Sequence, residues 1–316
     1  MHEDFNQARK GYFRVLSVII PAYNEEEIIP QTASVIDGIL SGENIEHELL
    51  FVNDGSKDKT WEKIEEQAKV FTSVRGVSFS RNFGKESAIF AGIAEAKGEC
   101  CVVIDCDLQH PPEKIVEMYR LWEQGYEIVE GVKTDRGRES GFHKFAAKSF
   151  YGIMSNSVGF DMSRASDFKL LDRKAMNVLL NMREKNAFFR ALSSWIGFKS
   201  TEVEYEVRER EVGTSKWSTK ALFKYALTNI TSFTSAPMQI VTILGFIVFI
   251  VGLGASLEAI ITFFEGKAQD GFTTVIILEC FTGSFIMMAL GIIGFYISKI
   301  YDEVKGRPKY IIDKTV

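Results

Sequence analysis

The first half of the chain alternates short apolar runs with longer amphipathic stretches. Apolar, β-branched runs bounded by polar turns are typical of buried strands, and apolar residues that recur every three to four positions are typical of helices. We therefore expect strands over 15–20, 48–53, 74–79 and 100–105, each followed by a helix, over 25–40, 59–71, 84–97 and 111–124. Strand and helix alternating at this spacing predict an α/β domain whose mostly parallel sheet is flanked by helices.

After the fourth helix the pattern becomes less regular. Helical periodicity returns over 142–158, and short apolar runs predict further strands over 168–171 and 201–207. The second of these alternates polar and apolar residues, which indicates a strand near a sheet edge. From 217 to 233 apolar residues share one helical face beside three lysines, so this segment either lies flat on a membrane surface or packs on the α/β domain.

Two long apolar stretches follow, over 237–264 and 273–300, and they carry only Glu258, Glu279 and Lys299 as charged residues. A bilayer core of about 30 Å is spanned by about 20 apolar residues in a helix. Both stretches therefore predict transmembrane helices, with a buried helical hairpin in a soluble domain as the alternative. The two glutamates are functional candidates inside a membrane, or they lie near the external interface.

The predicted organisation has four regions. They are an α/β domain over 1–212, a membrane-proximal amphipathic segment over 213–236, a transmembrane hairpin over 237–300 and a basic tail over 301–316. Basic residues flank the hairpin on one side, namely Lys216, Lys220, Lys224, Lys299, Lys305, Arg307 and Lys309. By the positive-inside rule the α/β domain and both termini lie in the cytoplasm, on a multi-pass protein of the cell membrane. The polar start MHEDFNQARKGYF predicts no signal peptide.

Charge and cysteine content narrow the function further. The net charge of the 316 residues is −5, which argues against a nucleic-acid-binding protein. The four cysteines show neither a disulfide framework nor the spacing of a metal-ligand motif, so reduced, structural thiols are expected.

The stretch VVIDCDLQHPPE places two acids, Asp105 and Asp107, where the fourth predicted strand gives way to a loop. Side chains alternate along a strand, so both carboxylates are expected on one face. Two neighbouring anions repel unless a cation or a shared proton lies between them. In an α/β sheet this edge is where ligands bind, so the pair predicts a metal site, with a solvated turn as the alternative.

Three strand ends carry polar motifs in order: PAYNEEE over 21–27, VNDGS over 52–56 and DCDLQHPPE over 105–113. Together they resemble the family 2 glycosyltransferases of the GT-A fold. Further motifs make the resemblance more specific. They are SRNFGKESAIFAG from residue 80, ASDFKLLDR from residue 165, and RERE and VGTSKW from residue 208, followed by two apolar spans. This combination covers nearly the whole chain and is similar to the polyprenyl-phosphate glycosyltransferases, which include dolichol-phosphate mannose synthases and bactoprenol glucosyltransferases.

The resemblance implies an inverting transfer of a sugar from a nucleotide sugar to a polyprenyl phosphate at the cytoplasmic membrane face. It favours glucose carried by UDP, and it implies Mg²⁺ or Mn²⁺ as cofactor. The lipid-linked product is used across the membrane, which calls for a separate flippase. Glycines in both apolar stretches permit close helix packing within one chain or between chains, so a homo-oligomer stays open.

The same resemblance assigns residues to the donor and the metal. The residues expected to bind the nucleotide sugar are Pro21, Ala22, Tyr23, Glu25, Asp54, Lys85 and Asp105. Asp105, Asp107 and Gln109 are expected to hold the metal, because Mg²⁺ and Mn²⁺ prefer oxygen ligands. Family members often carry a second acid where this chain has Asn53. Because Asn53 is uncharged, the sequence does not support a role for a charge at this position.

Asp167 and Asp107 are the expected catalytic residues. Asp167 stands at the position of the family's proposed base. A phosphate monoester has a second pKa of about 6 and is mostly ionised near pH 7, so it needs little activation. Asp167 is therefore expected either to take a proton, to orient the acceptor, or to stabilise positive charge on the sugar, with a structural cap as the alternative.

A lipid phosphate needs local cations on a chain of negative net charge. The residues expected to bind it are Lys133, Arg136, Arg138, Arg208, Arg210, Ser215 and Lys216. Arg81 serves either substrate, as does Lys85. Two other functions compete with the transferase: a phosphatase or phosphotransferase that uses Asp105 as its nucleophile, and a non-catalytic membrane tether that binds nucleotide sugars.

Overall fold

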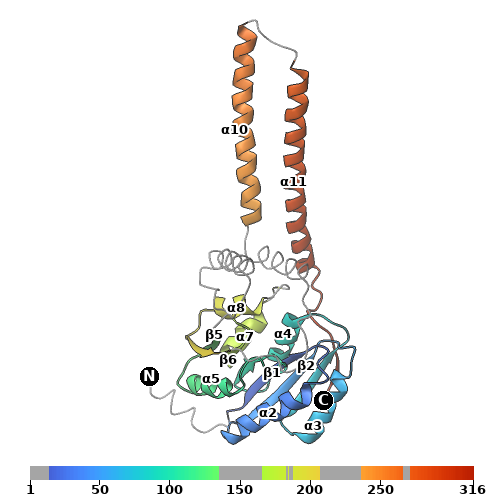
Figure 1. Ribbon diagram of the computed structural model, residues 1–316, viewed down its shortest axis with the longest axis vertical. Coiled ribbons are helices and arrows are strands. Elements are labelled where there is room, and N and C mark those ends of the chain that lie inside the picture. The colour runs from blue at the N-terminus through green and yellow to red at the C-terminus, as the bar shows by residue number, and fades with distance from the viewer. Residues whose placement is uncertain (1–13, 135–165, 183, 185–187, 207–235, 266–270) are drawn as a thin grey trace. The chain divides into compact units, whose positions relative to one another are not determined.

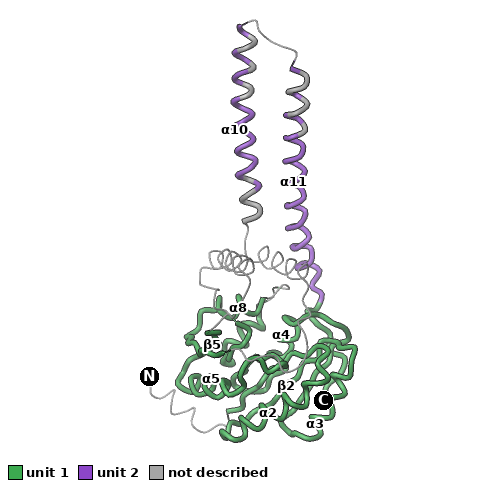
Figure 2. The backbone as a smooth tube through the Cα atoms, viewed as in Figure 1, with its two compact units in different colours: residues 1–219, 308–316 green, residues 220–307 purple. Residues whose placement is uncertain are grey.

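The structure, a computed structural model, describes residues 14–134, 166–182, 184, 188–206, 236–265 and 271–316. The chain divides into two compact units (Figure 2). The first is Met1–Thr219 together with Pro308–Val316, and the second is Lys220–Arg307. The predicted helix over 142–158 and the predicted amphipathic face over 217–233 lie outside the described residues.

The described strands of the first unit form one sheet in the order β7-β5-β6-β4-β1-β2-β3-β8 (Figure 1). The strands are β1 (Leu16–Ala22), β2 (His47–Asn53), β3 (Val74–Phe79), β4 (Cys100–Val103), β5 (Ile128–Lys133), β6 (Lys169–Asp172), β7 (Ser200–Tyr205) and β8 (Ile312–Thr315). The central strands β4, β1, β2 and β3 are parallel, and β6 and β8 run antiparallel to their neighbours. The predictions of a mostly parallel sheet and of an edge strand near 201–207 are confirmed.

Helices cover both faces of the sheet. They are α2 (Ile29–Gly42), α3 (Thr60–Val70), α4 (Lys85–Glu95), α5 (Glu113–Glu123), α7 (Arg173–Asn181) and α8 (Phe189–Trp195). Leu16, Val18 and Ile20 of β1 share one core with α2, α3 and α5. The intervening Ile19 points at α4 on the opposite face, where a side chain at Gly92 would collide with it. This alternation along β1 places α4 on the face of the sheet opposite to α2, α3 and α5.

The end of the chain adds an unforeseen strand to this sheet. The sequence predicted only a basic tail over 301–316, whereas β8 pairs with β3 and residue Val316 exchanges two backbone hydrogen bonds of 2.9 Å with Gly76. Tyr310 stacks on Phe79 with ring centroids 5.1 Å apart. The pairing joins segments more than 230 residues apart, which no local pattern reveals, and it covers the β3 edge.

Deleting residues 308–316 should destabilise the first unit. The deletion removes the backbone pairing along β3, and hydrogen bonds of this kind contribute about 0.5–1.5 kcal/mol each. Because 1 kcal/mol corresponds to about 2–4 °C for a domain of this size, a melting temperature lower by roughly 5–10 °C is expected, with more aggregation in light scattering. Asp313→Asn, on the exposed side of β8, is the matched control and should melt as the unaltered chain does. Equal melting of the truncated and full chains would contradict this role of β8.

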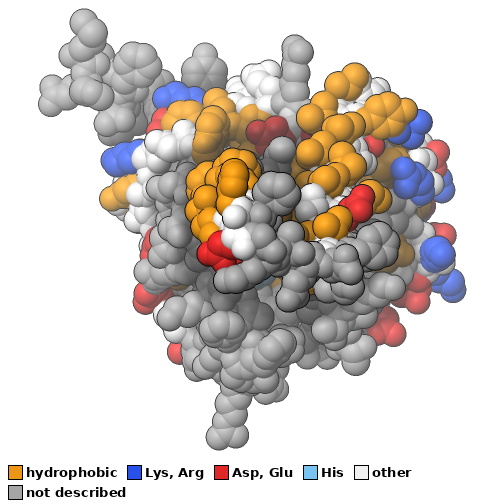
Figure 3. All heavy atoms as spheres, turned by 90° about the horizontal axis from the view of Figure 1, so that it is seen from above, with side chains coloured by type: hydrophobic (Ala, Val, Ile, Leu, Met, Phe, Trp, Pro, Cys, Tyr) orange, Lys and Arg blue, Asp and Glu red, His pale blue; other side chains and the backbone are white. Residues whose placement is uncertain are grey.

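The described residues of the second unit form two long helices, α10 (Ala236–Phe264) and α11 (Phe272–Val304). An apolar groove runs between them, lined by Leu244, Gly245 and Val248 of α10 and by Phe285, Ile286 and Ala289 of α11. Large hydrophobic side chains are exposed along both helices, and Figure 3 shows them end-on in orange. Such surfaces are stable in lipid and unfavourable in water.

Among the described residues, one segment is long and apolar enough to cross a membrane, Phe281–Val304 of α11. A shorter apolar segment, Ile243–Gly254, lies within α10. Helices are thus present over both predicted spans. The prediction that both cross the membrane stays a prediction.

Candidate active site

The carboxyl ends of β1 and β2 are locked together by their turns. The Asp54 N–H donates to the Ala22 carbonyl at 2.9 Å, and the Glu25 N–H donates to the Thr60 hydroxyl at 2.8 Å. Asn24, between them, adopts a positive φ of 54° and accepts from the Lys57 N–H. A non-glycine residue in this conformation is uncommon and is often found where function constrains the backbone.

The predicted donor-binding residues lie on this rim. Pro21 and Ala22 end β1, and Tyr23 and Glu25 follow in the turn, partly buried. Asp54 directly follows β2 and is 4% exposed. A contact between any of these residues and a nucleotide sugar stays a prediction.

Asp54 has structural partners that the sequence did not reveal. Its carboxylate accepts from the Phe83 N–H at 2.7 Å and from the Gly84 N–H at 2.9 Å. Burial raises the pKa of Asp54, and these two amides act in the opposite direction. Gly84 has a φ of 99°, which favours glycine, and α4 begins at the next residue. Asp54 therefore fixes the start of α4.

Lys85, the first residue of α4, lies between two carboxylates. Its Nζ is 2.6 Å from Oδ1 of Asp105 and 2.9 Å from Oδ2 of Asp167. Burial opposes ionisation of Asp105, but the charge of Lys85 outweighs it, so the pKa of Asp105 lies below its usual value. The structure thus brings three of the predicted site residues together from positions that are far apart in the sequence.

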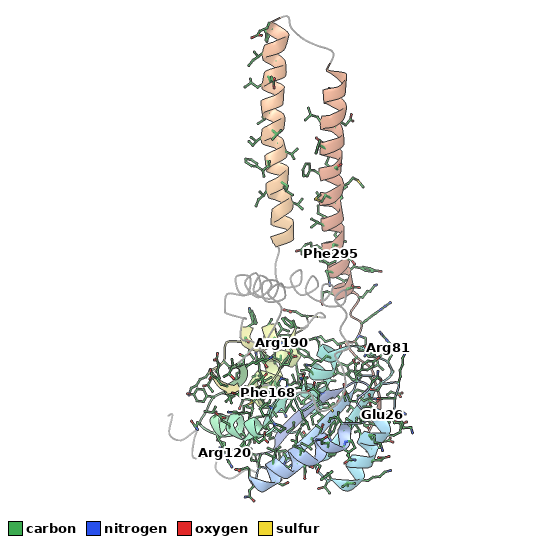
Figure 4. All side chains as sticks on the ribbon, viewed as in Figure 1. Glu26, Arg81, Arg120, Phe168, Arg190 and Phe295 are labelled. Atoms are coloured by element: carbon green, nitrogen blue, oxygen red, sulfur yellow. The ribbon has the colours of Figure 1, made fainter. Side chains whose placement is uncertain are left out.

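Asp167 is held by two cations. Arg190 of α8, labelled in Figure 4, donates from Nε to Oδ1 of Asp167 at 2.7 Å and from a terminal nitrogen to Oδ2 at 2.9 Å. Lys85 adds its ammonium, 2.9 Å from Oδ2. Burial would raise the pKa of Asp167, which is 7% exposed, but Lys85 and Arg190 keep it far below the usual range. A carboxylate with so low a pKa is a poor proton acceptor near pH 7. The geometry favours a positioning or electrostatic role over that of a base.

Sequence reasoning missed Arg190 and the residues that support α8. The buried Lys169 of β6 donates to the hydroxyls of Ser193 and Ser194 at 2.9 and 2.8 Å and pairs with Glu130 at 3.1 Å. Burial lowers the pKa of Lys169, and Glu130 opposes that shift. One signal was present, a lysine inside the apolar run Phe168–Leu171, since a lysine is rarely buried without a partner.

The Asp105–Gln109 loop corrects one detail of the prediction. β4 ends at Val103, so Asp105 and Asp107 lie in a turn beyond the strand, and strand alternation does not orient them. Asp107 instead accepts the Gln109 N–H at 3.2 Å, and Leu108 between them has a positive φ of 56°. The local hydrogen bond in the turn sets the direction of Asp107.

Aromatic and hydroxyl contacts hold this loop on the domain. His110 stacks on Phe168 with centroids 5.1 Å apart and meets the edge of Tyr205. The Thr32 hydroxyl donates to the Cys106 carbonyl at 2.8 Å. These contacts from α2, from Phe168 just before β6 and from β7 hold the loop on the domain.

The described oxygen donors fit a divalent cation that also binds phosphate. Asp105, Asp107 and Gln109 offer carboxylate and amide oxygens on one short turn, and no cluster of three or more His, Cys, Asp and Glu occurs among the described residues. Mg²⁺ is usually held by one or two carboxylates together with substrate phosphates and water. A site of this kind is complete only with a phosphate ligand.

The predicted acceptor-binding residues are mostly outside the described part of the chain. These are Arg136, Arg138, Arg208, Arg210, Ser215 and Lys216. Lys133 ends β5 and is exposed, and the Arg81 guanidinium lies 4.2 Å from the ring centroid of Phe83. The acceptor-binding role of all of these residues stays a prediction.

Glu86 gives the site a pH dependence. Burial and the charge of Asp167 raise the pKa of Glu86 from 4.5 to about 7. The hydrogen bond from the Phe189 N–H and the charges of Arg190 and Lys85 act in the opposite direction. Between these pH values the folded chain binds a proton that the unfolded chain lacks, so this contribution to stability falls as pH rises. Glu86→Gln cannot ionise, so its melting temperature should rise relative to the unaltered chain between pH 5 and pH 8.

Thermal melts across this range, compared with the exposed control Glu66→Gln, measure the effect. The Glu66 variant should follow the unaltered chain at every pH. Parallel melting curves of the Glu86 variant and the unaltered chain would contradict the raised pKa.

The fold and the site together define an α/β protein with an Asp-x-Asp loop at the carboxyl edge of its sheet. The family model "Glycosyl transferase family 2" matches residues 17–192, so the chain belongs to glycosyltransferase family 2 and its fold is GT-A-like. The protein is therefore a transferase enzyme, and this result argues against the phosphatase and tether alternatives.

Relatives match nearly the whole chain. The chain is 39% identical over 303 residues to the glycosyltransferase YkcC of Bacillus subtilis, covering 95% of this chain and 93% of the relative. It is 35% identical over 304 residues to the prophage bactoprenol glucosyl transferase homolog of Escherichia coli, covering 95% and 98%. Among solved structures, glucosyl-3-phosphoglycerate synthase from Mycobacterium tuberculosis with Mn²⁺, UDP-glucose and glycerol 3-phosphate covers 74% of this chain and 84% of that one, at 21% identity and a TM-score of 0.49.

Proposed function

We propose that this glycosyltransferase moves a glucosyl group from UDP-glucose to a polyprenyl phosphate at the cytoplasmic face of the membrane. The observation that carries the proposal is the 35% identity to a bactoprenol glucosyl transferase homolog over 95% of the chain, apolar helices included. The cluster of Lys85, Asp105, Asp167 and Arg190 at the sheet edge supplies the charges that such a transfer needs.

A divalent cation, Mg²⁺ or Mn²⁺, would be held by Asp105, Asp107 and Gln109. When bound there, it neutralises the diphosphate as that group leaves. The rim residues Pro21, Ala22, Tyr23, Glu25 and Asp54 are proposed to contact the nucleotide, either directly or by fixing the turns around it.

The reaction needs no strong base. A phosphate oxygen of the acceptor attacks the anomeric carbon while the bond from that carbon to the diphosphate oxygen breaks, and UDP leaves with the electron pair, which inverts the configuration. Because the acceptor is already mostly ionised near pH 7, no proton has to be removed. Asp167, held ionised by Lys85 and Arg190, stabilises positive charge that develops on the sugar.

The acceptor is proposed to arrive from the inner leaflet. Its phosphate would meet the basic residues Lys133, Arg136, Arg138, Arg208, Arg210 and Lys216, with a hydrogen bond from Ser215. Helices α10 and α11 would both span the membrane and keep the first unit and both termini cytoplasmic. The product would then require a separate flippase, and the glycines of α10 and α11 would permit close helix packing in a homo-oligomer.

Transfer assays with the full chain in nanodiscs test the proposal. Labelled UDP-glucose, UDP-galactose and GDP-mannose are each incubated with undecaprenyl phosphate and Mn²⁺, and the lipid phase is counted. Label from UDP-glucose should enter the lipid phase only when both the polyprenyl phosphate and the metal are present. Label entering from GDP-mannose alone would overturn the donor assignment, and absence of any lipid product would overturn the acceptor assignment.

A further inference from the structure

The ammonium of Lys85 occupies a position between the two parts of the site. It contacts Asp105 of the Asp-x-Asp loop at 2.6 Å and Asp167, just before β6, at 2.9 Å. The side chains of Lys85 and Asp105 are 37% and 30% exposed, whereas that of Asp167 is 9% exposed. Lys85 is therefore a cation already bound to an oxygen that the proposed metal would use.

The position of this ammonium is fixed from both sides. Asp54 binds the amides of Phe83 and Gly84 and so sets where α4 begins and where Lys85 projects. On the other side, Arg190 holds Asp167 through both carboxylate oxygens. The ion pairs of Lys85 with Asp105 and Asp167 are therefore held in place by neighbouring residues on both sides.

Charge balance makes the ammonium and a divalent cation competitors. Lys85 pairs with Asp105 and Asp167, Arg190 pairs with Asp167, and Asp107 lies two residues beyond Asp105 in the same turn. These three carboxylates and two cations together leave one net negative charge. A divalent cation alone would make the cluster net positive and would have to displace the ammonium from Asp105. A diphosphate that arrives with the cation restores the balance and offers the displaced ammonium a new anionic partner.

We propose that Lys85 is an internal competitor that keeps Asp105 from binding a divalent cation alone and so couples metal binding to donor binding. The inference rests on the proposed function, because it needs a metal and a diphosphate at this site. Lys85 then has two partners in turn: Asp105 before the donor binds, and the diphosphate afterwards. The coupling ensures that the metal binds together with its donor.

Mn²⁺ binding to the full chain, followed by electron paramagnetic resonance with and without UDP, tests the inference. Lys85→Met removes the ammonium and keeps a good helix former. Without UDP this variant should bind Mn²⁺ at least about tenfold more tightly than the unaltered chain, because the competing charge has gone. With UDP the advantage should shrink or reverse, because the diphosphate has lost its partner.

Lys114→Met is the matched control. It removes one positive charge near the start of α5, from a lysine that pairs with Glu117, and should leave Mn²⁺ affinity unchanged. Tighter Mn²⁺ binding by Lys85→Met without UDP, with a smaller or reversed advantage when UDP is present, distinguishes competition from general damage, which would weaken Mn²⁺ binding under both conditions.

Two results would overturn the inference, and they are distinguishable. If UDP strengthens Mn²⁺ binding equally in the unaltered chain and in Lys85→Met, Lys85 does not couple the two ligands, while the proposed function stands. If no variant binds Mn²⁺ even with UDP, and Asp105→Asn changes nothing, the metal site of the proposed function fails and the inference fails with it.

Discussion

Asp107→Asn should lower the rate of sugar transfer by about three orders of magnitude or more. The substitution removes one of the two carboxylates proposed to hold the cation, and a bound metal contributes several kcal/mol to stabilising a departing anion, at about 1.4 kcal/mol for each factor of ten. The asparagine oxygen still accepts the Gln109 N–H, so the turn that presents it keeps its hydrogen bond. The loss should therefore appear in kcat without a change in melting temperature.

Glu117→Gln is the control for removal of an acid in the same region. Glu117 is 51% exposed and pairs with Lys114 on the surface of α5, so transfer should be unaffected. Near-normal transfer by Asp107→Asn in the presence of Mn²⁺ would contradict the role given to the Asp-x-Asp loop.

Lys169→Met should be the most destabilising of the single substitutions described. Lys169 is 0% exposed and lies directly opposite Glu130 in the β5–β6 pairing. Removing one partner of a buried ion pair costs about 3–5 kcal/mol, and here the mostly buried Glu130, 18% exposed, loses its counter-ion and keeps the Ser166 N–H. At about 2–4 °C per kcal/mol, the melting temperature should fall by roughly 10 °C.

The same change should also reduce transfer. Lys169 binds Ser193 and Ser194 of α8, and α8 carries the Arg190 that holds Asp167. A small displacement of such a group can cost about a hundredfold in rate. Lys174→Met, a lysine 62% exposed beside Glu127, should change stability by less than about 1 kcal/mol. If Lys169→Met melts like that control, the buried pair does not support the site.

Much of the fold followed from local pattern. The apolar runs that became β1, β2, β3 and β4 were visible because buried parallel strands are continuously apolar. The end of β4 was misplaced by two residues, since the last strand pairing stops at Val103 and only the structure shows where the ladder ends. β8 was missed because its partner is more than 230 residues away in the sequence.

The site could be predicted only in part, because some of its contacts join residues that are far apart in the sequence. Asp105 and Asp107 stood out as an Asp-x-Asp pair that follows an apolar run, and Asp167 was predicted through the resemblance to the family. Arg190 did not, because its importance comes from Asp167, which is 23 residues away on another element. Asp54 was predicted to bind the donor, which stays a prediction, and its binding of the Phe83 and Gly84 amides could not be foreseen, since tertiary packing decides which donors reach a carboxylate.

The most direct test of the account is a crystal structure of the full chain with UDP-glucose and Mn²⁺, with the metal located by its anomalous scattering. The account predicts one strong peak that joins Asp105 and Asp107 to the diphosphate, with the Lys85 ammonium moved from Asp105 to a phosphate oxygen. A donor bound at the sheet edge with its diphosphate away from both aspartates, and no peak between them, would contradict it.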